Sequence, residues 1–179
     1  MNIKNRKKEF MHREICSLCF IASLGMARKI PFYKNNKINR EPIKKYLRDE
    51  LWKLSIKYSQ KIKGNNHIKT IEDFKNQANK KFSGKLAGSG FTFGRAQKLV
   101  NLYLKYMWVC EYIKEPPHCP IDSSIIKKLG RELHKLSFLK MNKDEYKKVI
   151  SKIEKKKGNQ SIAEWELNIF NSTIINRKK

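Results

Sequence analysis

One segment of the sequence is apolar around almost the whole circumference of a helix, and this segment constrains the fold most. Residues 95–110, RAQKLVNLYLKYMWVC, keep their polar side chains on one narrow face, at Gln97, Lys98, Asn101 and Lys105. A helix of this kind is typical of the middle of a protein. Its polar face must meet water, a cleft or a ligand. We therefore predict a central helix over 95–110.

Apolar residues recur at three- and four-residue steps in the rest of the chain as well, which is typical of helices. Pro42 suits a first helical turn, and the pattern after it predicts a helix as far as Ile62. Thr70 with Asp73 resembles a capping box that begins the next helix. Further helices are expected within 15–27, from Asp122 and Ser123 to Leu136, after the capping box Asn142/Glu145 and after the capping box Ser161/Glu164.

Sustained period-two alternation does not occur in the sequence, so an all-α fold is predicted. The length suits one core, and residues 1–179 are expected to form a single compact multi-helix domain. The N-terminal helices can form a small lobe of it. Residues 175–179, INRKK, are expected to be a frayed tail.

The charge balance points to a polyanionic partner. The chain has 41 Lys and Arg against 16 Asp and Glu, a formal net charge of +25. Such an excess repels itself unless a polyanion shares the surface, which favours nucleic acid. An anionic membrane is the rival, but the basic residues are spread along the whole chain and are not gathered in one amphipathic segment. We expect DNA as the partner, no membrane and a monomer; charge alone does not separate DNA from RNA.

The basic N-terminal residues followed by the apolar segment 15–27 could be read as a secretory signal. Glu14 interrupts the junction between them, which favours a core helix and a cytoplasmic protein. No stretch approaches the roughly 18 apolar residues of a membrane span.

The four cysteines do not form a metal-binding pattern. Cys16 and Cys19 are a C-x-x-C pair, but Cys110 and Cys119 lie far away, whereas a zinc site would usually show a second close pair. Reduced and mostly buried thiols are expected, with no metal and no cofactor.

Lys98 and Asp122 each have a structural and a functional interpretation. A lysine on a core helix can extend its amine to solvent, and an aspartate after CPI can simply cap the next helix. However, Pro116, Pro117 and Pro120 stiffen the loop before Asp122. A carboxylate fixed in this way is also a well-oriented ionised group, so capping and catalysis can coexist in one residue.

Taken in order, these residues resemble the core of the helix-hairpin-helix DNA glycosylases, and most closely the archaeal 8-oxoguanine glycosylase type. LAGSG at 86–90 is similar to the hairpin of that superfamily, which usually reads L-P-G-V-G. GRAQK then carries Lys98, and CPID carries Asp122 where the family has P-V-D. The resemblance covers residues 84–135. Eight residues separate Gly90 from Lys98, which is more than the usual hairpin leaves.

The resemblance implies a reaction on an extruded nucleotide. Lys98 would attack C1′, expel a damaged or modified base and form a Schiff base that can eliminate the 3′ phosphate, an AP lyase step. Attack needs a neutral amine, which burial beside the cation Lys105 favours. Asp122 would stabilise the oxocarbenium-like sugar and orient the nucleophile, or deliver water in a monofunctional enzyme. The excised base, and a role in repair or in phage defence, stay open.

A base pocket and a surface for the DNA backbone are implied as well. The candidates for the base pocket are Phe91, Phe93, Gln97, Asn101, Trp108 and His118. The candidates for backbone contacts are Gly88, Gly90, Gly94, Arg95, Lys105, Lys127, Lys128 and Arg131. Aromatic residues at these spacings are also typical of a core, and a histidine between prolines is typical of a loop.

Two other classes of function compete with this one. A noncatalytic, basic, helical nucleic-acid-binding protein explains the charge equally well, but it does not explain the polar face of a buried helix. A metal-dependent nuclease has little support, because acidic residues are few and no D-x-D or E-x-K pairing stands in a plausible strand.

Overall fold

The computed structural model describes residues 3–24, 31–88 and 90–176. Within these ranges the regular elements are helices, and an isolated antiparallel bridge joins Tyr33 to Leu86. The α-helices are α1 (Ile3–Leu24), α2 (Glu41–Lys57), α3 (Gly64–Lys81), α4 (Phe93–Val109), α5 (Ser123–Lys128), α6 (Lys143–Lys156) and α7 (Ile162–Asn176), and a single 3-10 turn spans Arg131–Leu133. The predicted all-α fold is confirmed.

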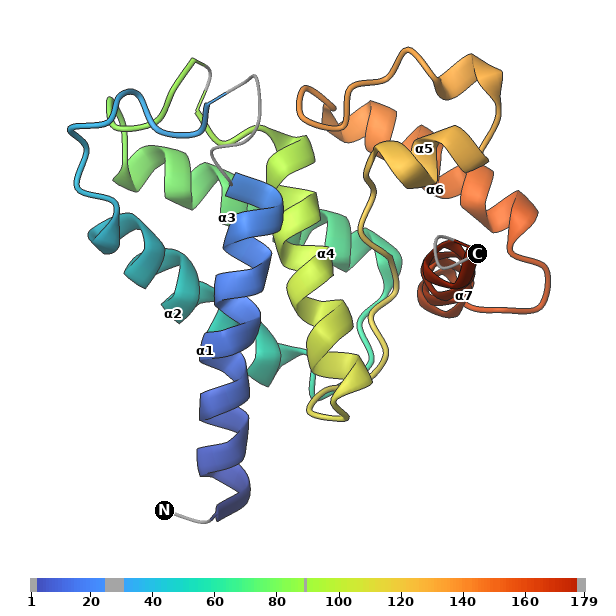
Figure 1. Cartoon of the computed structure of the whole chain (residues 1–179), viewed down its shortest axis with the longest axis horizontal. Coiled ribbons are helices and arrows are strands. Elements are labelled where there is room, and N and C mark those ends of the chain that lie inside the picture. Colours follow the sequence, from blue (N-terminus) through green and yellow to red (C-terminus); the bar gives the residue numbers. More distant parts are fainter. Residues whose placement is uncertain (1–2, 25–30, 89, 177–179) are drawn as a thin grey trace.

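Helix α4 lies in the middle of the protein, with α1, α2 and α3 packed against it and α6 in contact with it (Figure 1). Most of its apolar side chains are buried, and Leu99, Tyr103 and Met107 are fully so, whereas Val109 at its last turn is exposed. The predicted central helix is therefore confirmed, although it begins at Phe93 and not at residue 95. The earlier start follows from Thr92, whose hydroxyl accepts a hydrogen bond from the backbone N–H of Arg95 at 3.2 Å.

Helices α3 and α4 pack against each other and are joined by residues 82–92. This connection is held to the segment before α2 by two backbone hydrogen bonds, Lys34 N–H to Lys85 O and Ala87 N–H to Phe32 O. One cluster of buried apolar side chains extends from Ile15 in α1 to Ile162 in α7, so the same core serves both ends of the described chain.

Helices α2 and α3 also have other boundaries than the sequence predicts. Thr70 lies inside α3, which begins at Gly64, and its hydroxyl donates to the carbonyl of Asn66, so the predicted capping box at Thr70 is wrong. The same three-residue spacing also occurs between neighbours on one helix face, which is why the pattern misled. Helix α2 ends at Lys57, before the predicted Ile62.

Helix α5 is also shorter than predicted. It ends at Lys128, because Gly130 has a φ of +122°, which a side-chain-bearing residue rarely adopts. Leu136 therefore lies beyond the helix in an irregular segment.

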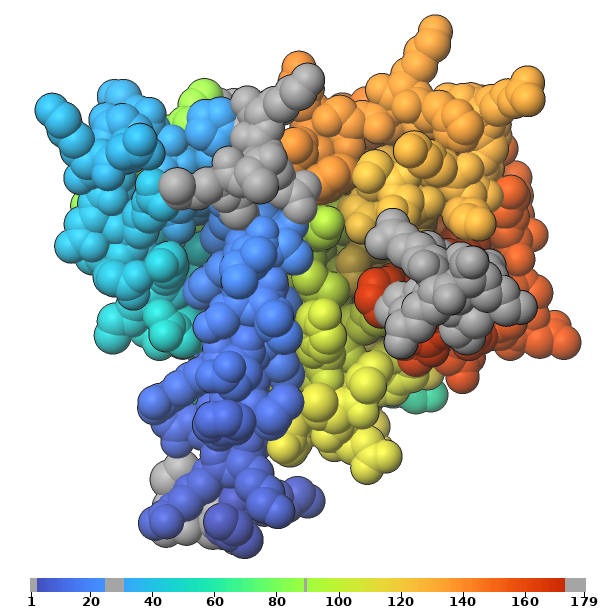
Figure 2. Space-filling view, viewed as in Figure 1, coloured from blue at the N-terminus to red at the C-terminus, as the bar shows by residue number. Residues whose placement is uncertain are grey.

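The capping boxes at Asn142/Glu145 and Ser161/Glu164 are confirmed by reciprocal hydrogen bonds. At the N-terminal end, α1 begins at Ile3, so the basic residues and the apolar segment belong to one helix that projects beyond its neighbours (Figures 1 and 2). Residues 25–27 of the predicted core helix and residues 177–179 of the predicted tail lie outside the described ranges; α7 extends to Asn176. None of the helices described has the length and apolar character needed to cross a bilayer.

Candidate active site

The fold brings Lys98 and Asp122 together. The Lys98 Nζ lies 3.5 Å from the Asp122 Oδ2, although the two residues are 24 positions apart in the sequence. Lys98 points from the buried face of α4 and is only 8% exposed, whereas a third of the Asp122 side chain is exposed. The pair thus lies at the edge of the core, with the amine on the inner side and the carboxylate reaching solvent.

Asp122 uses its two carboxylate oxygens for different contacts. Oδ1 accepts hydrogen bonds from the backbone N–H groups of Ser124, at 2.9 Å, and Ile125, at 3.2 Å, and so caps α5. Oδ2 faces the Lys98 amine. The structural and the functional interpretation of Asp122 are therefore compatible, because capping occupies only one oxygen.

Phe138 covers the amine of Lys98. The Lys98 Nζ lies 4.8 Å from the centre of the phenyl ring, a cation–π distance. The segment that carries Phe138 is fixed to the start of α4 at two points: Thr92 Oγ1 donates to the carbonyl of Leu139 at 2.6 Å, and Gly94 N–H donates to the carbonyl of Met141 at 2.9 Å. Sequence reasoning missed Phe138, since its irregular segment lies 40 residues from Lys98.

Gly94 is what allows this segment to approach α4. A Cβ atom at position 94 would lie 1.7 Å from the backbone oxygen of Phe138. The Gly94 N–H is also used, by Met141. In this conformation Gly94 therefore serves close packing and presents no N–H group to a phosphate.

Three of the predicted base-pocket residues belong to a buried hydrogen-bond network. The Gln97 side chain bonds to both backbone groups of Ile121. Asn101 accepts from His67 Nε2 at 2.7 Å, and its Nδ2 lies 2.9 Å from the carbonyl of Cys119. His118 Nδ1 lies 3.0 Å from the Tyr146 hydroxyl, which also contacts Asn101. These polar groups are already satisfied by the protein.

Burial keeps the two histidines of this network neutral. It lowers the pKa of His67 to about 3, with a further contribution from nearby His118, and lowers that of His118 to about 4. Their rings meet edge to face with centres 4.9 Å apart. Neither ring is placed to act as an acid or base at the surface.

The aromatic candidates do not gather at Lys98. Phe91 packs against Phe32 and Phe74, and Phe93 against Tyr146, all within the core. Trp108 is half-buried on α4 and lies ten residues, about 15 Å of helix, from Lys98.

Three of the predicted backbone contacts, Gly88, Gly90 and Arg95, line a hollow of about 470 Å³ next to the start of α4, together with Lys140. Arg95 is nearly buried, with its guanidinium 5.5 Å from the centre of the Phe32 ring. Lys127, Lys128 and Arg131 are exposed on and just after α5.

Lys105 is not at the surface. Its amine lies 2.7 Å from Glu166 Oε2, and both side chains are almost fully buried between α4 and α7, beside Phe170. Burial raises the pKa of Glu166, and the adjacent Lys105 opposes that shift. The sequence analysis expected the positive charge of Lys105 to favour a neutral Lys98 amine. Glu166 compensates that charge, so Lys105 does not act on Lys98 in this way. No local spacing points to this partner, which lies 61 residues away in the sequence.

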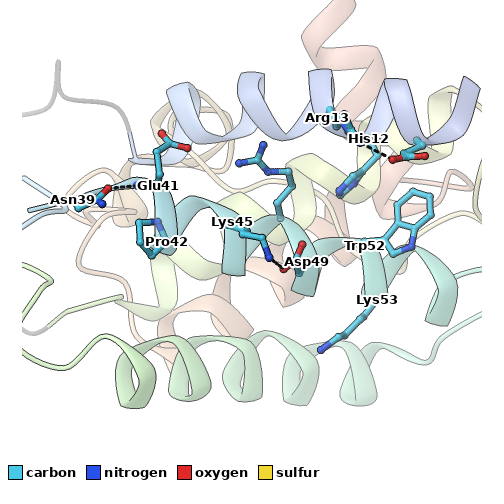
Figure 3. A pocket seen from close by; sticks show the side chains of 11 residues that line it. His12, Arg13, Asn39, Glu41, Pro42, Lys45, Asp49, Trp52 and Lys53 are labelled. Carbon is cyan, nitrogen blue, oxygen red and sulfur yellow. Dashed lines mark hydrogen bonds and ion pairs between the residues drawn. The ribbon is translucent and has the colours of Figure 1, made fainter. Parts of the chain in front are cut away.

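A larger hollow, about 1000 Å³, lies between α1 and α2 (Figure 3). His12, Trp52, Lys45 and Asp49 are among its lining residues, and Figure 3 shows Lys45 paired with Asp49. Its lining includes no residue of α4 or α5, so it is separate from Lys98 and Asp122.

In the part of the chain that the structure describes, no group of His, Cys, Asp and Glu side chains is arranged to hold a metal ion. The four cysteines are unpaired, and burial raises the pKa of the Cys16 thiol to about 12.

Comparison of the chain with protein-family models, curated proteins and solved structures found no match.

Proposed function

We propose that the protein is a DNA glycosylase of the helix-hairpin-helix type, with Lys98 as the nucleophile and Asp122 as the assisting carboxylate. The observation that carries the proposal is the 3.5 Å approach of the Lys98 amine to Asp122 across 24 residues of sequence. The order α3, connection, α4 and capped α5 fits the resemblance found in the sequence. A net charge of +25 suits a duplex DNA substrate.

In the proposed reaction, the neutral Lys98 amine forms a bond to C1′ while the bond from C1′ to the base breaks, and the base leaves with the electron pair. Before the attack, the resting Lys98 ammonium gives a proton to Asp122, which passes it to the base as the bond from C1′ to the base breaks. The carboxylate is then negative again and stabilises positive charge on the sugar. The nitrogen now bonded to C1′ loses a proton by way of Asp122 to O4′ as the C1′–O4′ bond breaks, which gives the Schiff base from which the 3′ phosphate can be eliminated.

Access to Lys98 requires Phe138 to move. Its ring lies on the amine, so an extruded nucleotide has to displace the ring, after which the phenyl face can stack on the base. The described conformation corresponds to the DNA-free protein in this proposal.

The test is borohydride trapping on a duplex with one abasic site, which needs no knowledge of the excised base. Wild-type protein is expected to form a covalent adduct, and Lys98→Gln to bind the duplex without forming one. Lys69→Gln makes the same change at an exposed position on α3 and should trap normally. A panel of duplexes with damaged or hypermodified bases, read by base release, tests the monofunctional form.

A noncatalytic nucleic-acid-binding protein is the second candidate. It is favoured by the exposed basic residues Lys127, Lys128 and Arg131 and by the cover over Lys98. Duplex binding without adduct or base release on any of these substrates would establish it instead.

A further inference from the structure

Gln97 makes a two-sided contact with the backbone immediately before Asp122. Its Nε2 donates to the carbonyl of Ile121 at 2.6 Å, and its Oε1 accepts from the N–H of Ile121 at 3.1 Å. Gln97 and Ile121 are both fully buried, so water does not compete for these bonds. The amide thus engages both backbone groups of Ile121, as a neighbouring strand would.

Asn101 extends the same contact by one helical turn. Its Nδ2 donates to the carbonyl of Cys119 at 2.9 Å. Residues 97 and 101 are about 6 Å apart along a helix, and residues 119 and 121 are about 6.6 Å apart in an extended chain. Because these spacings match, residues 119–121 run along α4 in the opposite direction, and Asp122 follows directly after the Gln97 contact, with its Oδ2 3.5 Å from the Lys98 amine.

Two adjacent residues of α4 therefore meet two adjacent residues of the loop: Gln97 holds Ile121, and Lys98 faces Asp122. The first contact has two directed hydrogen bonds in the core, whereas the second is one longer ion pair at its edge. The position of Asp122 is thus fixed more strongly by the backbone of Ile121 than by its own attraction to Lys98.

We infer that Gln97 is a positioning residue that sets the distance between the Lys98 amine and the Asp122 carboxylate. This inference rests on the proposed function for its effect on rate, but its geometric part does not. It replaces the role in base recognition expected for Gln97, since both polar atoms of the amide are engaged with Ile121.

The main variant is Gln97→Glu, which has the same shape. An ionised glutamate can accept from Ile121 N–H but cannot donate to Ile121 O, whereas a protonated one can do both. With wild-type trapping established, Gln97→Glu at pH 8 is expected to bind the abasic duplex normally and to form the adduct about 10- to 100-fold more slowly at saturating protein. The defect should shrink as the pH falls, because protonation restores the donor.

Asn79→Asp is the matched control. The Asn79 amide makes the same two-sided contact, with both backbone groups of Phe91, but next to the hairpin and not next to Lys98. The Asn79→Asp protein should differ from the wild type in stability or in affinity for the duplex. Its single-turnover rate of adduct formation should be unchanged. A folded Gln97→Glu protein that traps at the wild-type rate at pH 8 would overturn the inference.

A second measurement does not depend on activity. A double-mutant cycle with Lys98→Gln and Asp122→Asn, read by urea unfolding, measures the coupling between the pair. The coupling is expected to be present with Gln97 and lost with Gln97→Leu. Equal coupling with Gln97 and with Gln97→Leu would contradict the inference, even if the wild-type protein forms no adduct. Failure of the wild-type protein to form an adduct would by itself refute only the proposed function.

Discussion

At the scale of single residues, Asp122 performs two separable tasks. Oδ1 caps α5, and Oδ2 faces Lys98. Asparagine keeps an oxygen for capping but carries no charge.

Asp122→Asn is therefore expected to keep the cap and to lose only the stability that comes from the ion pair with Lys98, while slowing adduct formation on the order of 100-fold, since the charge that assists the reaction is lost. Asp122→Ala should in addition lower the free energy of unfolding by about 1 kcal/mol through loss of the cap. Urea unfolding and single-turnover trapping check the two effects separately. Equal trapping by Asp122→Asn and wild type would show that the residue is only a cap.

Gly94 gives a second prediction at this scale. Its added Cβ in Gly94→Ala would meet the Phe138 carbonyl, so the segment over Lys98 must shift. We expect a loss of about 1–3 kcal/mol in stability and faster chemical acylation of Lys98, read by peptide mass spectrometry. Gly84→Ala is the control: its Cβ meets no atom within 4 Å, but its φ of +74° strains an alanine, so it should lower stability without changing the reactivity of Lys98. Unchanged Lys98 reactivity in folded Gly94→Ala would show that this segment does not limit access.

At the scale of elements, the docking of α7 on α4 depends on Lys105 and Glu166. Lys105→Met leaves Glu166 buried without its partner and is expected to destabilise the protein by about 3–5 kcal/mol. The double change Lys105→Met, Glu166→Leu should recover most of that loss, because no buried charge remains.

Thermal unfolding of the wild type, Lys105→Met, Glu166→Leu and the double variant measures this coupling. Lys45→Met, which breaks the exposed pair with Asp49, should have little effect in the same assay. Additive losses at Lys105 and Glu166 would mean that the pair does not hold the two helices together.

The elements also show which parts of the fold could be predicted from the sequence. The all-α fold class, the central α4 and the capping boxes at Asn142 and Ser161 follow from local sequence patterns, and these were predicted. The start of α3 was not, since a three-residue spacing of Thr and Asp fits both a helix start and a helix interior. The ends of α2 and α5 were not either, and α5 stops before Gly130, whose φ of +122° apolar spacing does not reveal. Lys98 and Asp122 could be singled out, but Phe138 and Glu166 reach α4 only through tertiary packing, which no local spacing encodes.

At the scale of the whole molecule, stability is expected to fall with acid before the carboxylates titrate. The pKa values of His67, about 3, and His118, about 4, lie below the unfolded value near 6.5, so the unfolded chain binds protons that the fold does not. Their contribution is complete above pH 6.5 and declines as the pH falls toward 4. Each histidine should cost about 1.4 kcal/mol per pH unit in that window.

Urea unfolding at pH 7, 6 and 5 measures how steeply the free energy of unfolding changes with pH. His118→Gln removes one of the two protonation sites and should lower that slope by about 1.4 kcal/mol per pH unit. A free energy of unfolding that stays constant from pH 7 to 5 would contradict the neutral, buried state of both rings.

The net charge of +25 leads to a prediction for binding. If about six phosphates are neutralised, log K should fall with log salt with a slope near −5, or about 1000-fold between 50 and 200 mM salt. Fluorescence anisotropy with a labelled duplex measures the slope, and reversal of charge at Lys127 and Lys128 should make it shallower. A flat salt dependence would assign the charge to another partner.

The register of α4 also limits how the chain can change in length. Four polar residues of α4 each contact a different partner: Gln97, Lys98, Asn101 and Lys105. Each residue added to a helix turns the part that follows by about 100°. One inserted codon after Lys98 would rotate Asn101 and Lys105 away from Cys119 and Glu166 while leaving the composition almost unchanged. Viable variants of this protein should therefore carry insertions and deletions in connections such as 34–39, and only substitutions in α4.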